Sequence, residues 1–221
     1  MMNIFSIFDP TTNYYLSLNW LSMLIMFFLF PFQYWLLPSR FMFFWMKFIK
    51  FIFMEFKALI NYSYSNIIIF ISLLLMILLN NFLGLFPYIF TASSHMSMSL
   101  SLSLIFWLST MLYTIFSYFK ILLAHLTPLG TPFILMPFMV IIESISLMIR
   151  PLTLSIRLTA NMIAGHLLLS LLGSSGQLIN NIMIMPILLF SQILLFMLEI
   201  SVALIQSYVF SILSTLYSSE I

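Results

Sequence analysis

Long apolar runs separated by short polar stretches dominate the pattern along this chain. Several of the runs exceed about 18 residues, the length that a helix needs to cross a bilayer. A helix is the expected conformation of each run, because lipid offers no partner to an unpaired backbone N–H or C=O group. The pattern therefore predicts an all-α polytopic membrane protein that forms a single domain over residues 1–221. Its membrane helices, about five in number, are expected at 16–37, 66–86, 97–119, 132–172 and 178–217.

The third run opens with a different periodicity. From Met96 to Leu104, methionine and leucine alternate with serine, a period of two that by itself indicates a strand. We nonetheless expect a helix there, because an open strand edge would leave backbone groups unpaired in lipid.

The last two runs are too long for simple spans. As a helix, residues 132–172 would extend about 60 Å, against a hydrocarbon core of about 30 Å, and residues 178–217 form a run of similar length. Such a mismatch requires steep tilt or breaks in the helix. We expect a strongly tilted helical hairpin that turns at Gly173–Gly176. Three prolines are candidate break points: Pro137, Pro151 and Pro186.

The stretch at 40–60 has a basic amphipathic pattern. Its four basic residues fall within an arc of about 100° on a helix, and aromatic and aliphatic residues occupy much of the remainder. A helix of this kind lies in the membrane surface rather than crossing the bilayer. The four residues are Arg40, Lys47, Lys50 and Lys57.

The positions of the basic residues predict the orientation in the membrane. Lys120 lies between the third and fourth runs, whereas the N-terminus and the loops near 88–96 and 173–181 contain no Lys or Arg. With five crossings, every flanking basic residue falls on one side, which is the inner side by the positive-inside rule. The N-terminus is then expected outside and the C-terminus inside.

Composition narrows the class of protein further. With 63% hydrophobic and 5% charged residues, the chain differs from a soluble globular domain, in which about 25% are charged. The absence of cysteine excludes disulfides and thiolate metal sites, and no Gly-rich phosphate loop, metal-spaced cluster or catalytic triad is present. We expect no cofactor, metal, catalytic site or nucleic-acid partner. His95 and His125 fall at loop positions and are expected to be solvated or interfacial.

Sparse polar residues recur every seven positions in the last two runs. Glu143, Arg150 and Arg157 fall within about 40° of one another on a helix. Asn161 returns to the same stripe, and His166 lies about 100° around from Arg157 and about 13 Å further along the axis. In the final run the same spacing separates Gln192, Glu199 and Gln206. Each stripe could face either the other helix of the hairpin or another subunit.

Arg157 is the most unusual member of these stripes. A guanidinium at bilayer depth costs about 2.5–3.5 kcal/mol on insertion scales, and arginine cannot be deprotonated in a protein. It is therefore interpreted as an electrostatic device, although a snorkelling or salt-bridged arginine that only fixes packing is the alternative. For Glu143 the alternative is an ion pair with Arg150 or an interfacial position. His166 and Glu199 have purely structural alternatives as well, in packing or hydrogen bonding between helices.

A permanent positive charge between titratable groups interrupts a continuous proton wire, but it separates two half-paths. Glu143, His166 and Glu199 can gain and lose protons, whereas Arg157 cannot. The missing element is a mobile carboxylate on another subunit, which would give up its proton as it nears Arg157.

The residues quoted above, together with several other segments, resemble subunit a of F-type ATP synthase in its mitochondrial form. The likeness covers nearly the whole chain and is strongest where the last long apolar runs carry their polar residues. The segments that carry it are 81–88 (NFLGLFPY), 127–132 (TPLGTP), 142–151 (IESISLMIRP), 157–166 (RLTANMIAGH), Glu199 and 206–210 (QSYVF).

The resemblance implies a role for each polar residue. Arg157 would face the acidic residue of the rotor ring, with Asn161 and Gln206 flanking it. His166 and Glu199 would line the inlet half-channel from the intermembrane space, and Glu143 the outlet toward the matrix. The implied partners are the ring of c subunits, a small accessory membrane subunit, the peripheral stalk, membrane lipid and protons, in the mitochondrial inner membrane. The chain would not be an enzyme by itself.

Two other functions remain open at this point. A self-contained proton-coupled transporter would predict an internal repeat, and the two halves show no convincing match. An assembly scaffold without a conduction path would leave the buried charges without a reason.

Overall fold

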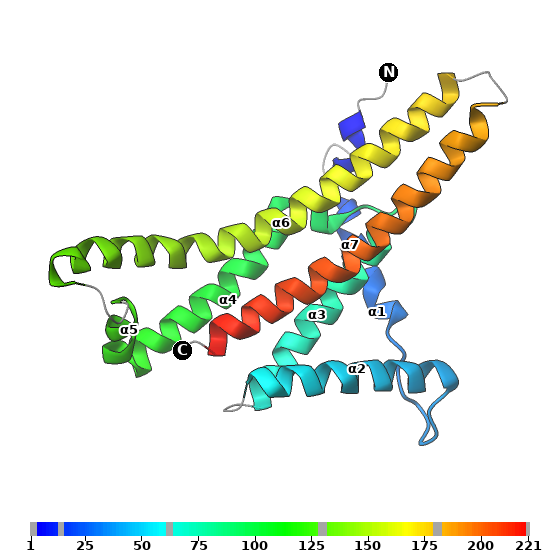
Figure 1. Ribbon diagram of the computed structural model, residues 1–221. Helices are drawn as coiled ribbons and strands as arrows, with labels where there is room; N and C mark the ends of the chain where they lie inside the picture. Colours follow the sequence, from blue (N-terminus) through cyan, green and yellow to red (C-terminus); the bar gives the residue numbers. More distant parts are fainter. Residues whose placement is uncertain (1–3, 13–15, 61–63, 128–131, 179–182, 220–221) are drawn as a thin grey trace.

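A computed structural model describes residues 4–12, 16–60, 64–127, 132–178 and 183–219. Within these residues all elements are helical, as predicted (Figure 1). The 3₁₀ helices are η1 (Ile4–Phe8), η2 (Leu18–Leu24), η3 (Ala92–Ser94) and η4 (Phe133–Leu135). The α-helices are α1 (Ile25–Leu29), α2 (Arg40–Leu59), α3 (Tyr64–Gly84), α4 (Met96–Ser117), α5 (Phe119–His125), α6 (Met136–Leu178) and α7 (Met185–Ser219).

Four of the described helices are long and apolar enough to cross a membrane, which confirms the polytopic class. They are α3, α4, α6 and α7, and each overlaps a predicted span. The alternating segment from Met96 onward is the start of α4, so the pairing of backbone groups within the helix prevails over the period-two pattern.

The first apolar run differs from its prediction. Helix extends only over Leu18–Leu29, about 20 Å at the rises of 3₁₀ and α helices, and not over the whole of 16–37. The helix ends because Phe30 adopts an extended conformation, with ψ of 122°, and the ring of Pro31 disfavours helical geometry in the residue before it. The remaining residues connect this short helix to α2.

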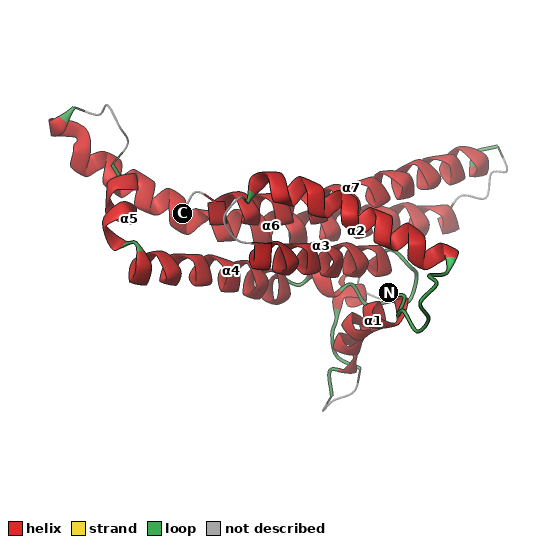
Figure 2. Ribbon diagram, turned by 90° about the horizontal axis from the view of Figure 1, so that it is seen from below, coloured by secondary structure: helices red, strands yellow, loops and turns green. Residues whose placement is uncertain are grey.

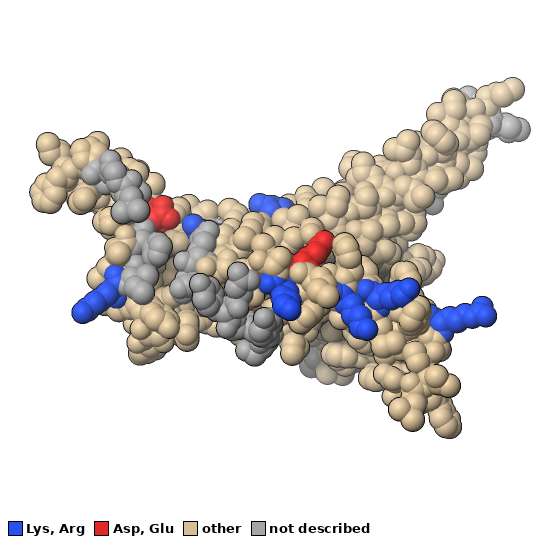
Figure 3. All heavy atoms as spheres, turned by 60° about the horizontal axis from the view of Figure 1, so that its bottom comes forward, with Lys and Arg blue, Asp and Glu red and all other residues tan. Residues whose placement is uncertain are grey.

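Helix α2 is the amphipathic helix expected at 40–60. The side chain of Ser39 accepts a hydrogen bond of 3.3 Å from the N–H of Met42 and caps its start. One face buries Ile52 and Phe56 against α3. The basic residues gather in a row on the opposite, exposed face (Figure 3).

The bundle forms around α7, which packs along α3 and α6, while α4 packs along α6 (Figures 1 and 2). On α7, four small residues at four-residue spacing are fully buried: Ala203, Ser207, Ser211 and Thr215. The three hydroxyl groups donate to carbonyl oxygens one turn back in their own helix. Small, internally satisfied side chains let neighbouring helices approach closely in a membrane.

Helices α6 and α7 form the long hairpin that the sequence predicts, but its turn lies elsewhere. Gly173–Gly176, the predicted turn, is part of α6, which continues to Leu178, and α7 begins at Met185. Ser174 and Ser175 donate to carbonyl oxygens of the preceding turn and do not cap a helix end.

The three prolines also act differently from the prediction. Pro137 and Pro186 occupy the first turns of α6 and α7, where a missing N–H costs no hydrogen bond. Of the three, only Pro151 lies in the interior of a helix. There it removes one backbone hydrogen bond of α6. Helix α6 passes through Pro151 without ending, although it is not straight (Figure 1).

Candidate functional site

Glu199 reaches across the hairpin from α7 to the backbone of α6. Its side chain is 6% exposed. A Cβ atom placed on Gly165 would lie 2.7 Å from the Oε1 atom of Glu199 and 3.0 Å from its Cδ atom. Only glycine therefore accommodates the carboxyl group in this position. The contact brings Glu199, from the polar stripe of α7, against the backbone of the helix that carries the other stripe.

His166 is the next residue on α6, and its Nε2 atom is buried without a hydrogen-bond partner in the described part of the chain. Both carboxyl oxygens of Glu199 are buried and unpartnered in the same way. The two side chains therefore belong to one region but are not hydrogen-bonded to each other. Buried polar atoms of this kind are normally satisfied by water or by another polar group.

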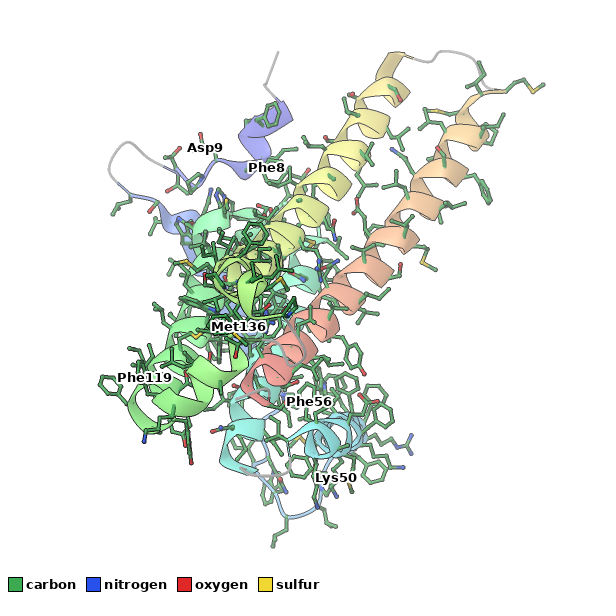
Figure 4. The ribbon with its side chains drawn as sticks, turned by 60° about the vertical axis from the view of Figure 1, so that its left-hand side comes forward. Phe8, Asp9, Lys50, Phe56, Phe119 and Met136 are labelled. Atoms are coloured by element: carbon green, nitrogen blue, oxygen red, sulfur yellow. The ribbon has the colours of Figure 1, made fainter. Side chains whose placement is uncertain are left out.

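The ring of Phe8, in η1, covers one side of His166. The two ring centroids lie 6.4 Å apart at an interplanar angle of 81°, an edge-to-face contact. This packing brings the N-terminal segment onto α6 (Figure 4). No sequence pattern indicates this contact, because η1 and His166 lie far apart along the chain.

Arg157 lies on an exposed face of α6. Among the described residues it makes neither an ion pair nor a hydrogen bond. The neighbouring Leu154 and Leu158 are buried against α3 and α7. Ala160 and Ala164, on the side of Arg157 away from the bundle, are exposed. The guanidinium thus stands beside an open strip of small residues rather than inside the bundle.

Asn161 and Gln206, predicted to flank Arg157, are both half-buried. Asn161 lies about one turn after Arg157 on α6. Gln206 lies on α7, about two turns beyond Glu199 in the direction of the C-terminus. They occupy the stretch of the hairpin between the Glu199 region and the C-terminal end of α7.

Glu143 forms an ion pair with Arg150 near the start of α6, with 3.8 Å between Oε1 and Nη2. The guanidinium of Arg150 also stacks on Tyr217 of α7, 4.8 Å from the ring centroid. Tyr217 in turn lines a small cavity of about 30 Å³ beside Pro151. Of the two structural alternatives that the sequence left for Glu143, the pair with Arg150 is present.

Two asparagines that the sequence interpretation did not single out are buried in α3. Asn81 is 0% exposed, and neither its amide nitrogen nor its amide oxygen has a partner among the described residues. The amide nitrogen of Asn80 is in the same state. Two consecutive amides in an otherwise apolar span were the available signal, because burying an unpaired amide is costly.

His95 is packed against aromatic rings rather than solvated, which was one of the two positions expected for it. Its ring stacks on Phe90 at 5.1 Å between centroids and contacts Trp20 at 5.2 Å. Its Nε2 atom is buried without a partner. The side chain of His125 lies outside the described part of the structure. No group of three or more His, Asp or Glu side chains in the described ranges is arranged to hold a metal ion.

In the described part of the chain, four long apolar helices with ionisable and amide groups buried among them define a polytopic membrane protein. A family model described as ATP synthase A chain matches residues 16–219. ATP synthase subunit a of Anopheles gambiae is 54% identical over 224 residues, which cover 100% of this chain and 99% of that protein. The Drosophila melanogaster and Aedes aegypti proteins are 54% and 51% identical over the same shares of each chain. The chain belongs to the ATP synthase A chain family, which confirms the resemblance seen in the sequence.

Proposed function

We propose that this chain is the proton-translocating stator subunit of the membrane part (F0) of mitochondrial ATP synthase. Membership of the family supports an F0 subunit that crosses the mitochondrial inner membrane several times. The observation that carries the finer proposal is Arg157, a permanent charge at membrane depth without an ion-pair partner in the described part of the chain.

The partner of Arg157 is a carboxylate on the ring of c subunits. A charge at membrane depth is tolerated when a countercharge is brought to it. The exposed Ala160 and Ala164 beside Arg157 allow a partner helix to come close. As the ring carboxylate approaches the guanidinium, its charged form becomes favoured and its proton leaves.

The inlet half-channel is formed by His166 and Glu199, with Asn161, Gln206 and Asn81 beside the path toward the ring. The buried, unpartnered atoms of His166, Glu199 and Asn81 support this assignment, because such atoms are normally paired with ordered water. Water among them would connect the titratable groups and let a proton pass from the intermembrane space to a ring carboxylate.

The outlet half-channel begins at Glu143. Along α6, Glu143 lies about 21 Å from Arg157 in one direction and His166 about 13 Å in the other. Arg150 holds the Glu143 carboxyl group at the inner end of the bundle. The fixed charge of Arg157 separates the two half-channels, so a proton reaches Glu143 only by travelling on the ring.

Each proton therefore turns the ring by one subunit. It enters through His166 and Glu199, neutralises a ring carboxylate, travels with the ring, and leaves toward Glu143 when that carboxylate reaches Arg157. The chain itself performs no nucleotide chemistry. The other expected partners are the small accessory membrane subunit, the peripheral stalk and the surrounding lipid.

The orientation places the N-terminus toward the intermembrane space and the C-terminus toward the matrix. The N-terminal segment begins beside the outer part of α6 and reaches α2 at the opposite end of the bundle (Figure 1). The basic face of α2 then meets the matrix surface, in agreement with the positive-inside rule.

Chemical blockage of the ring carboxylates tests the stator role. We expect dicyclohexylcarbodiimide, which modifies buried carboxyl groups, to stop proton conduction through F0 vesicles from which the soluble part has been removed. Conduction is measured by the quenching of a pH-sensitive dye after a potassium diffusion potential is imposed. Labelling must be shown to fall on the ring and not on Glu199. Conduction that persists with every ring carboxylate modified would instead favour a self-contained transporter.

Gly165→Ala tests the position of Glu199. The added methyl group would lie 2.7 Å from Oε1 of Glu199, so the carboxyl group must move, and we expect proton pumping to fall by about tenfold to 100-fold. Gly173→Ala is the matched control in the same helix, since its Cβ would be 3.8 Å from Gln192. Equal pumping by the two variants would show that proton pumping does not depend on the position of the Glu199 carboxyl group.

A further inference from the structure

Asp9 is the one charged side chain in a large part of the sequence. The stretches 1–39, 85–119 and 167–198 contain no other Asp, Glu, Lys or Arg. They include the N-terminal segment, the η3 connection and the outer end of the α6–α7 hairpin. On the face shown in Figure 3, the Lys and Arg side chains form a band across the molecule, and the outer end of the α6–α7 hairpin shows none. The field of Asp9 is therefore not cancelled by a neighbouring cation from these stretches.

The structure holds Asp9 close to the outer side of His166. The preceding residue, Phe8, makes the edge-to-face contact with His166, and η1 packs on α6. On the other side, the amide group of Asn19 donates a hydrogen bond of 3.1 Å to the backbone oxygen of Asp9. Phe8 and Asp9 lie beside α6, with Phe8 nearer the helix (Figure 4).

The carboxylate itself is exposed and kept ionised. The hydroxyl group of Thr11 donates to Oδ1 of Asp9 at 2.8 Å, and its backbone N–H donates at 3.2 Å. These two bonds lower the pKa of Asp9 below its ordinary value of 3.8. Asp9 therefore carries a negative charge near neutral pH.

We propose that Asp9 is a proton-collecting carboxylate at the outer mouth of the inlet half-channel, and that Phe8 is the positioning residue that holds it beside His166. This inference rests on the proposed function. The titratable groups that face this region are His166 from α6, Glu199 from α7 and His95 beyond Trp20. His166 and Glu199 are the titratable groups of the proposed inlet half-channel, so one anion at its mouth serves both.

The expected size of the effect follows from simple electrostatics. One unit charge about 7 Å away in water raises the local concentration of protons and of cationic buffer by about threefold. The same interaction is screened within about 3 Å at 1 M salt. A collecting carboxylate therefore gives a rate advantage that is present at low ionic strength and disappears at high ionic strength.

The test uses the whole ATP synthase in vesicles, with Asp9→Asn compared with Asp9→Glu. ATP synthesis is driven by an imposed pH gradient, and salt and buffer are varied only on the side of the N-terminus. We expect Asp9→Asn to be about two- to threefold slower at low salt and equal to the unmodified complex at about 1 M salt or with concentrated imidazole buffer. Asp9→Glu should remain close to normal. Equal rates at low salt, or a deficit that neither salt nor buffer relieves, would overturn the proposal.

Phe8→Ala separates positioning from charge. This variant keeps the carboxylate but loses the ring contact, so we expect the same salt-dependent deficit as in Asp9→Asn. A deficit independent of salt would show that Phe8 only stabilises the fold. Glu199→Gln, assayed in parallel, distinguishes a failure of the collecting role of Asp9 from a failure of the half-channel itself. If it is inactive while Asp9→Asn is normal, only the collecting role fails, whereas a fully active Glu199→Gln would remove the half-channel itself.

Discussion

Arg157→Ala should abolish ATP-driven proton pumping, although the soluble part of the complex still hydrolyses ATP. We expect a loss of at least about 100-fold, the size found when a single preorganised electrostatic group is removed from a reacting centre. Without the guanidinium, nothing favours loss of the proton from an arriving ring carboxylate. Nothing separates the two half-channels either, so protons can leak without turning the ring. Dye quenching in vesicles and phosphate release measure pumping and hydrolysis in the same preparation.

The variant is expected to fold and assemble, which makes the result interpretable. Arg157 makes no ion pair or hydrogen bond among the described residues, and its removal relieves an insertion cost of about 2.5–3.5 kcal/mol. Arg40→Ala, at the exposed start of α2, is the matched control and should pump normally. Arg157→Lys keeps the charge but not the planar fork, and we expect intermediate pumping. Normal coupled pumping by Arg157→Ala would contradict the stator role.

Glu199→Gln should give the second-largest loss, about 100-fold in proton pumping and in ATP synthesis. Glutamine has nearly the same shape and fits the space beside Gly165, but it cannot take up and release a proton at neutral pH. The loss should therefore appear without a change in the amount of assembled complex. The initial rate of proton uptake, normalised to the amount of this subunit, is the measurement.

Glu55→Gln provides the control for this substitution. Glu55 accepts a hydrogen bond of 2.9 Å from the hydroxyl group of Tyr208 and lies on α2, away from the inlet. The same chemical change there should leave pumping close to normal. If Glu199→Gln pumped as well as Glu55→Gln, the buried carboxyl group of Glu199 would have only a packing role.

The class of fold was predictable because lipid leaves the backbone few choices. The amphipathic helix at 40–60 and the long final hairpin were predictable for the same reason, since apolar length and charge periodicity respond directly to the bilayer. The ends of elements were less predictable. The first helix ends at Leu29 rather than Leu37 through the local geometry before Pro31. Gly173–Gly176 continues α6, where Ser174 and Ser175 bond to the preceding turn instead of capping an end.

The candidate site was predictable as a set of residues but not as an arrangement. Seven-residue spacing identifies Glu143, Arg157 and Glu199, because unpaired charges are costly in lipid wherever they occur. Spacing does not reveal that Asn81 is buried without a partner, or that the ring of His95 is packed between aromatic side chains. Both results depend on which helices become neighbours.

By itself, therefore, the sequence determined the helical class, the two polar stripes and the family, because each depends on local periodicity or on continuous motifs. Only the tertiary structure decided that Glu199 lies on Gly165 and that Phe8 covers His166. These contacts join residues that are far apart in the chain, and their geometry depends on how closely the helices approach. That approach is set by small buried side chains such as Ala203 and Ser207, whose effect appears only when the helices are packed together.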